Sequence, residues 1–269
     1  MKERIITGVV LAILALWAIL SFSLHVFGIV ICIVLLLVSL EWVTAFLSAK
    51  AWYKRVAYVA LTLIFAYLIW IYPQSHQIIL AVSVLWWLVA LIIIRLYSAG
   101  IIKKIHVVAK FFMGFLVILP AWVAIIILKR DNSLFLIFVI LAVALADSGA
   151  YFVGRFCGKH KLAPVISPKK TWEGLAGGIF FSVIGSVIFA LALRFDSAME
   201  YFLLIVLGVL VVFFALFGDL FESMIKREVG IKDSGNILPG HGGLLDRLDS
   251  LFVALPLFVF FANLFGFSI

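Results

Sequence analysis

The residues best suited to chemistry lie in a polar segment, residues 223–249, that separates two long apolar segments of this chain. The segment combines lysines, arginines and aspartates with a histidine and several glycines. Such a mixture at the border of a membrane is hard to explain by packing alone. It contains the groups needed to bind a phosphate-rich ligand together with a divalent metal ion.

Polar residues follow a helical spacing where the preceding apolar segment ends. Asp219, Glu222, Ser223 and Lys226 lie at i, i+3, i+4 and i+7, so on a helix they share one face. Asp219 follows an apolar run and is expected near the bilayer border, where an unpaired carboxylate is costly. We therefore expect Asp219 to be functional, and a structural salt bridge to a neighbouring helix is the alternative.

Two further acids, Asp246 and Asp249, lie three positions apart at the start of the next apolar segment. A glycine-rich loop between two helix ends can bring them close to Asp219. Carboxylates that meet in this way repel unless a cation lies between them, and Mg²⁺ binds one or two carboxylates together with substrate phosphates. For Asp249, interaction with the dipole of its own helix is an equal alternative.

The loop itself contains Gly240-His241-Gly242-Gly243. Glycines allow backbone N–H groups to approach an anion closely. The segment is not a Walker A motif, and a lone histidine is more often structural. The basic residues around the glycines make a phosphate site more specific; they are Lys226, Arg227, Lys232 and Arg247.

A second polar segment, residues 154–173, ends in hydrogen-bond donors suited to phosphate oxygens. They are Ser167, Lys169, Lys170 and Thr171. Asp147 in the preceding apolar segment shares a helical face with Tyr151 and Gly154, which directs it toward the same loop. Glu41 is another acid within an apolar segment, and it either lines the cavity or pairs with a neighbour.

The composition identifies a polytopic membrane protein. Of 269 residues, 67% are hydrophobic, and the mean hydropathy is +1.31, which excludes a soluble fold. The apolar segments are continuous rather than alternating, which favours helices over a barrel. Cys32 and Cys157 indicate no disulfide framework.

We predict an all-α, single-domain protein of 1–269 with about nine transmembrane helices and a catalytic part at about 140–255. The predicted spans are 5–22, 24–47, 56–72, 78–97, 106–128, 133–153, 174–193, 201–222 and 249–267.

The basic residues predict the orientation. With a cytoplasmic N-terminus, only Lys129, Arg130 and Arg194 of the 21 lysines and arginines lie outside. This arrangement places the loops 154–173 and 223–248 in the cytoplasm and the C-terminus outside. The net charge of +8 then reflects topology and anionic lipid rather than nucleic acid.

Residues 223–249 resemble the phosphatidate cytidylyltransferases, also called CDP-diacylglycerol synthases. The shared pattern is Ser-x-apolar-Lys-Arg-x4-Lys-Asp-x-Gly-x2-Leu-Pro-x-His-Gly-Gly-apolar-x-Asp-Arg-apolar-Asp, and the chain matches every fixed position. The region of Asp147 and residues 167–174 are also similar to that family, whereas residues 1–130 carry only generic membrane character. The resemblance implies that CTP and phosphatidic acid react, with Mg²⁺, to give CDP-diacylglycerol and pyrophosphate.

Roles follow from this resemblance. The lipid phosphate would attack the α-phosphorus of CTP, and we expect Asp219 and Asp246 to hold one or two Mg²⁺ ions, with Asp249 as the next candidate. Lys226 and the neighbouring basic residues contact phosphates, and His241 orients a phosphate or acts as an acid. The remaining substrate-binding candidates are Arg227, Lys232, Arg247, Gly242, Gly243, Ser167, Lys169, Lys170, Thr171 and Asp147.

The implied partners are cytoplasmic CTP and membrane phosphatidic acid, which meet at the cytoplasmic face of the inner membrane. Gly174, Gly177 and Gly178 permit close helix contacts within one copy or in a homo-oligomer. Three alternatives stay open: a CTP-dependent lipid kinase, a cytidylyltransferase for an ether-lipid phosphate, and a transporter that uses Asp147, Asp219 and Glu41 as coupling sites.

Overall fold

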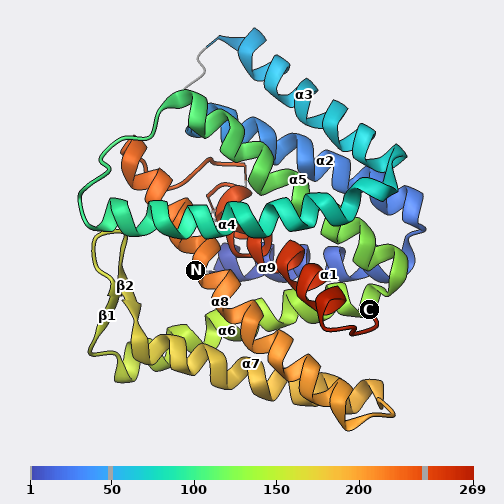
Figure 1. The fold of residues 1–269 in the computed structure, drawn as a ribbon. Helices are drawn as coiled ribbons and strands as arrows, with labels where there is room; N and C mark the ends of the chain where they lie inside the picture. The colour runs from blue at the N-terminus through green and yellow to red at the C-terminus, as the bar shows by residue number, and fades with distance from the viewer. Residues whose placement is uncertain (1, 48–50, 238–241) are drawn as a thin grey trace.

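The computed structural model describes residues 2–47, 51–237 and 242–269, and this part of the chain is helical except for one small β-hairpin (Figure 1). The elements are α1 (Lys2–Ser21), α2 (Leu24–Ala45), α3 (Trp52–Ile71), the 3₁₀ turn η1 (Pro73–Ser75), α4 (His76–Ser98), α5 (Val107–Asp131), α6 (Ser133–Cys157), β1 (Lys161–Ala163), β2 (Ser167–Thr171), α7 (Trp172–Leu193), α8 (Ala198–Val229) and α9 (Leu245–Leu264).

Seven helices in the described ranges are long and apolar enough to cross a membrane. They are α2, α3, α4 with its preceding turn, α5, α6, α7 and α8. A shorter apolar stretch, Gly8–Ser21, lies in α1. The polytopic membrane character is thus confirmed, while the count of nine crossings and the orientation stay predictions.

The interior is formed around α9, which packs against both α5 and α8. Helix α9 is almost wholly buried from Phe252 to Val259, and Figure 1 shows it at the centre of the molecule, behind α4. Large apolar side chains on the outer helices are exposed instead, for example Ile29, Ile78, Ile92 and Ile188. This distribution suits a surface surrounded by lipid.

The first correction to the sequence prediction concerns the ends of α8 and α9. We expected the helix to end at 222 and the next to begin at 249, but α8 continues to Val229 and α9 begins at Leu245. Gly230 ends α8 with a left-handed backbone (φ 76°), which glycine adopts without strain. Lys226 and Asp246 therefore lie on helices, and their positions are fixed more firmly than a loop would allow.

The second correction concerns the polar segment 154–173, which was expected to be a loop. It contains an antiparallel hairpin in which Lys161 pairs with Thr171 and Ala163 with Ser167. Strand β2 runs directly into α7, so Ser167, Lys169 and Lys170 are held on a strand next to the helix start. In Figure 1 the hairpin lies at one edge of the molecule, beside the ends of α6 and α7.

Candidate active site

The polar face predicted at the end of α8 is present. The Ser223 hydroxyl donates to Asp219 Oδ1 at 3.1 Å, and Lys226 Nζ lies 3.5 Å from Glu222 Oε1. The two contacts run along the same side of the helix, as spacing of four residues requires. Helix α8 therefore presents two carboxylates, a hydroxyl and an ammonium group in a row.

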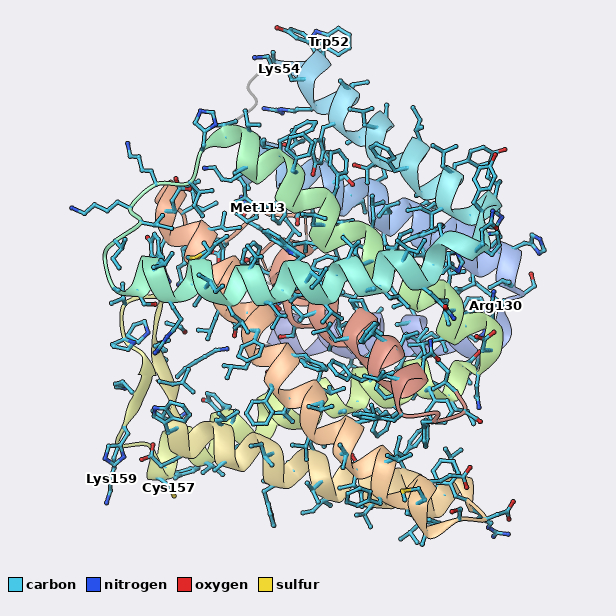
Figure 2. The ribbon with its side chains drawn as sticks, in the orientation of Figure 1. Trp52, Lys54, Met113, Arg130, Cys157 and Lys159 are labelled. Atoms are coloured by element: carbon cyan, nitrogen blue, oxygen red, sulfur yellow. The ribbon has the colours of Figure 1, made fainter. Side chains whose placement is uncertain are left out.

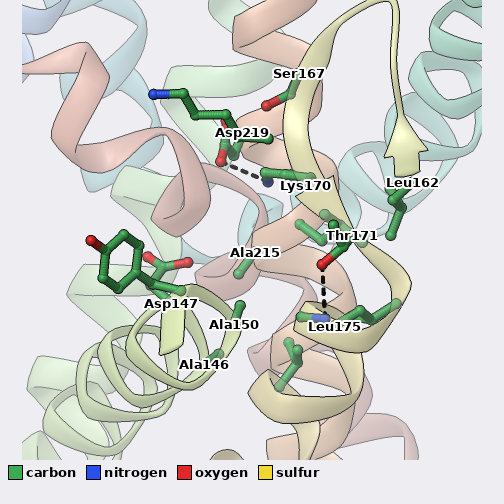
Figure 3. Close-up of a pocket in the computed structure, with 15 residues that line it drawn as sticks. Ala146, Asp147, Ala150, Leu162, Ser167, Lys170, Thr171, Leu175, Ala215 and Asp219 are labelled. Carbon is green, nitrogen blue, oxygen red and sulfur yellow. Dashed lines mark hydrogen bonds and ion pairs between the residues drawn. The ribbon is translucent and has the colours of Figure 1, made fainter. Parts of the chain in front are cut away.

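A cavity of about 320 Å³ lies between α6, the hairpin, α7 and α8, and of the four residues in this row only Asp219 lines it. Lys170 Nζ forms an ion pair with Asp219 Oδ2 at 2.6 Å, and Figure 3 shows this pair above Asp147. Ser167 and Lys169 line the same polar part. The remaining wall is apolar and includes Ala146, Ala150, Leu175, Val212, Ala215 and Leu216. Charged side chains thus line one part of the cavity wall, and apolar side chains line the rest.

Local hydrogen bonds hold the hairpin over this cavity. The Thr171 hydroxyl oxygen accepts from Gly174 N at 3.1 Å and so caps α7. The Glu173 carboxylate accepts from the backbone of Lys159 and His160 and contacts His160 Nδ1 at 2.6 Å. Thr171, predicted as a phosphate ligand, also lines the cavity, and the cap explains why the strand passes into the helix there.

Asp246 is the centre of a second cluster, at the start of α9. Its Oδ1 accepts from Lys226 Nζ at 2.7 Å, and its Oδ2 accepts from Ser234 N and Gly243 N, each at 2.9 Å. Burial alone raises the pKa of Asp246, but these hydrogen bonds outweigh it and hold the pKa below its usual value. The carboxylate is therefore ionised at neutral pH.

The glycines of the loop have distinct uses. Gly242 has φ 85°, a left-handed conformation, and a Cβ there would lie 3.0 Å from Asp246 Oδ2. The Gly243 N–H already donates to Asp246, so in this structure it stabilises a carboxylate rather than pointing to open space. Binding of phosphate by the Gly242-Gly243 backbone stays a prediction, and His241 and Gly240 lie outside the described residues.

Glu222 was placed on the α8 face by its spacing but was given no role. Its side chain is buried, and within the described part of the chain neither carboxylate oxygen has a hydrogen-bond partner. Asp249 lies within electrostatic reach of Glu222 and Asp219. The spacing of Glu222 along the sequence could not predict that its side chain is buried, because burial depends on the helices that cover α8.

The carboxylates at the α8–α9 junction outnumber the cations that pair with them. Asp219 pairs with Lys170, and Lys226 contacts both Asp246 and Glu222, so four carboxylates, counting Asp249, share two cations. No group of three or more histidine, cysteine or acidic residues in the described ranges is arranged as a metal cluster. Four carboxylates that share two cations would fit a divalent ion whose other ligands come from substrate phosphates.

The remaining basic candidates lie on the surface and are not among the residues that line the cavity. Arg227 and Lys232 are exposed near the end of α8, and Arg247 is exposed in the first turn of α9. The structure therefore gathers Asp147, Ser167, Lys169, Lys170, Thr171 and Asp219 around one cavity, and Lys226 with Asp246 in a cluster further along α8.

The chain is similar to known proteins over nearly its whole length. Residues 2–265 match the model of the cytidylyltransferase family. The chain belongs to this family. It is 39% identical over 262 residues to a phosphatidate cytidylyltransferase of Pseudomonas aeruginosa, covering 96% of this chain and 95% of that protein. It is 35% identical to the corresponding protein of Haemophilus influenzae, with 97% and 98% coverage.

A third relative matches over a shorter region. The phosphatidate cytidylyltransferase of Bacillus subtilis is 52% identical over 120 residues, which is 45% of this chain and 44% of that protein. The resemblance to phosphatidate cytidylyltransferases inferred from residues 223–249 is thereby confirmed. Membership of the cytidylyltransferase family also makes this integral membrane protein a nucleotidyltransferase by class.

Proposed function

We propose that this protein transfers the cytidylyl group of CTP to phosphatidic acid, giving CDP-diacylglycerol and pyrophosphate. The observation that carries the proposal is the cavity in which Lys170, Lys169 and Asp219 meet an apolar wall. A lipid phosphate needs cations for its headgroup and hydrocarbon for the adjoining glycerol and acyl chains. The names of the relatives support this choice of substrate.

In the proposed step a phosphate oxygen of the lipid forms a bond to the α-phosphorus of CTP. The bond from that phosphorus to the oxygen bridging to the β-phosphorus breaks, and pyrophosphate leaves with the electron pair. Such phosphoryl chemistry depends on positioning and on neutralising charge rather than on a covalent enzyme intermediate. Lys169 and Lys170 bind the lipid phosphate, while the exposed Arg227, Lys232 and Arg247 bind the triphosphate.

Asp219 and Asp246, with Asp249 and the buried Glu222 on the same two helices, would hold Mg²⁺. When bound, the ion would neutralise charge on phosphate oxygens. Lys226 keeps Asp246 in place through the 2.7 Å contact, and Lys170 does the same for Asp219 until substrate arrives. CTP would reach the site from the cytoplasm, and the lipid would enter from the cytoplasmic leaflet of the inner membrane.

The test uses purified protein in detergent with phosphatidic acid, Mg²⁺ and CTP labelled at the α-phosphate. We expect label in the lipid fraction, equimolar pyrophosphate, and loss of both when EDTA is added. A parallel reaction with diacylglycerol and CTP labelled at the γ-phosphate tests for lipid kinase activity. Transfer of the γ-label to diacylglycerol, with no α-label in lipid, would contradict the proposal and indicate a lipid kinase.

A further inference from the structure

Glu41 in α2 is a buried carboxylate, 4% exposed, whose partners lie some 200 positions along the chain. Its Oε1 accepts from Leu244 N at 2.9 Å, and its Oε2 accepts from Leu245 N at 2.8 Å. The Ser234 hydroxyl lies 3.5 Å from the same Oε2. The side chain therefore contacts the glycine-rich loop at both of its described ends.

These contacts cap α9 from another helix. The first N–H groups of a helix have no partner within it, and a negative charge near them is favourable. Leu244 occupies the N-cap position and forms no side-chain cap. Without Glu41, the N–H groups of Leu244 and Leu245 would lose these acceptors in a buried position, which is costly.

The loop is shaped to receive this carboxylate. A Cβ on Gly235 would lie 2.5 Å from Glu41 Oε1, and a Cβ on Gly243 would lie 2.9 Å from Oε2. Any side chain at these two positions would displace the carboxylate or the backbone. Contact with Glu41 thus explains the glycine at 235, and the close approach of Ser234, the Gly235 backbone and Glu41 together explains the glycine at 243.

We propose that Glu41 is a positioning residue that sets Asp246 for the transfer reaction, an inference that rests on the proposed function for its catalytic consequence. Asp246 Oδ2 accepts from Ser234 N and Gly243 N, and Glu41 holds the Ser234 hydroxyl and the residues after Gly243. The carboxylates of Glu41 and Asp246 therefore contact the same two segments of the chain, one at Ser234 and one at residues 243–245. A shift of the loop would therefore move Asp246 relative to Lys226.

The test compares Glu41→Gln with Glu41→Asp and with Ser39→Ala as the matched control. Ser39 is also buried in α2, but its hydroxyl donates only to Leu35 O within the helix. A carboxamide has one acceptor oxygen, so in Glu41→Gln its NH₂ group faces Leu244 N or Leu245 N. Hydrogen exchange of the peptide spanning residues 242–248 is measured by mass spectrometry, together with kcat and KM for CTP.

We expect faster exchange in Glu41→Gln, kcat lowered about ten-fold and KM for CTP changed by less than about two-fold. Glu41→Asp should recover part of kcat, and Ser39→Ala should alter neither measurement. Unchanged exchange in Glu41→Gln, or equal losses in Ser39→Ala, would overturn the proposal. If the wild-type protein transfers no cytidylyl group, the proposed function fails, and the exchange comparison alone decides whether Glu41 holds the loop.

Discussion

The two carboxylate oxygens of Asp246 accept hydrogen bonds from three donors, so even a substitution of the same shape would disrupt one of these bonds. Lys226 contacts Oδ1, and the N–H groups of Ser234 and Gly243 contact Oδ2. An asparagine has the same shape but presents a donor at one of these oxygens. Substitution would thus leave one donor facing another in a part-buried site.

We expect Asp246→Asn to lower kcat about 100-fold, because the charge that faces Lys226 and the proposed Mg²⁺ is lost. Steady-state cytidylyl transfer in detergent measures this, with thermal melting to show that the fold persists. Asp196→Asn makes the same chemical change at an exposed position between α7 and α8 and should leave kcat unchanged. Full activity of Asp246→Asn would remove Asp246 from the site.

Lys170 offers a second test at the level of single residues. Lys170→Met should lower kcat/KM by about 10- to 100-fold, which corresponds to the loss of one hydrogen bond to a charged group. The paired strand supplies the control, since Lys161 is exposed and does not line the cavity. If Lys161→Met reduces kcat/KM as much as Lys170→Met, general loss of positive charge explains both.

Among the elements, the pair α6–α7 determines where the hairpin lies. The two helices pack so closely that a Cβ on Gly149 would lie 2.7 Å from the Gly177 carbonyl oxygen. Backbone atoms cannot rotate away, so even one methyl group must separate the helices. Because β2 continues into α7, separation would also move Lys170 away from Asp219.

Gly149→Ala should therefore reduce the free energy of unfolding by about 1–3 kcal/mol, the usual effect of overpacking. Gly185→Ala is the control at the same interface, since its Cβ would meet only the mobile Cδ1 end of Leu145. Thermal melting in detergent compares the two proteins, and Gly185→Ala should melt close to the wild type. Equal melting temperatures for both variants would show that the contact at Gly149 relaxes without penalty.

For the whole molecule, the open question is its orientation in the membrane. Figure 2 shows Cys157 and Lys159 at one edge of the molecule and Arg130 at the opposite edge. The distribution of lysine and arginine predicts that the edge with the hairpin faces the cytoplasm. The two native cysteines allow a direct test, because Cys157 is exposed and Cys32 is half-buried in α2.

With Cys32 replaced by serine, Cys157 should react with a membrane-impermeant thiol reagent in inverted bacterial vesicles and not in right-side-out vesicles. Asp196→Cys, placed in a background without both native cysteines, should show the reverse pattern. Labelling of Cys157 from the outside would contradict the predicted orientation and the assignment of the site to the cytoplasmic face.

Much of the site was predictable because it depends on neighbours along one helix. The row formed by Asp219, Glu222, Ser223 and Lys226 follows from the helical repeat, and the apolar runs follow from composition. The extension of α8 to Val229 was missed, since polar residues there resemble a loop. The burial of Glu222 was also missed, because burial depends on which helices cover it.

The sequence alone determined that this is a polytopic helical protein with a basic, glycine-rich and carboxylate-rich segment, since hydropathy, charge and spacing are local properties. Only the tertiary structure decided which distant groups meet. Lys170 reaches Asp219 from a hairpin, and Glu41 reaches Leu244 and Leu245 from the other end of the chain. Such pairs depend on how helices pack in three dimensions, and no periodicity along the chain encodes them.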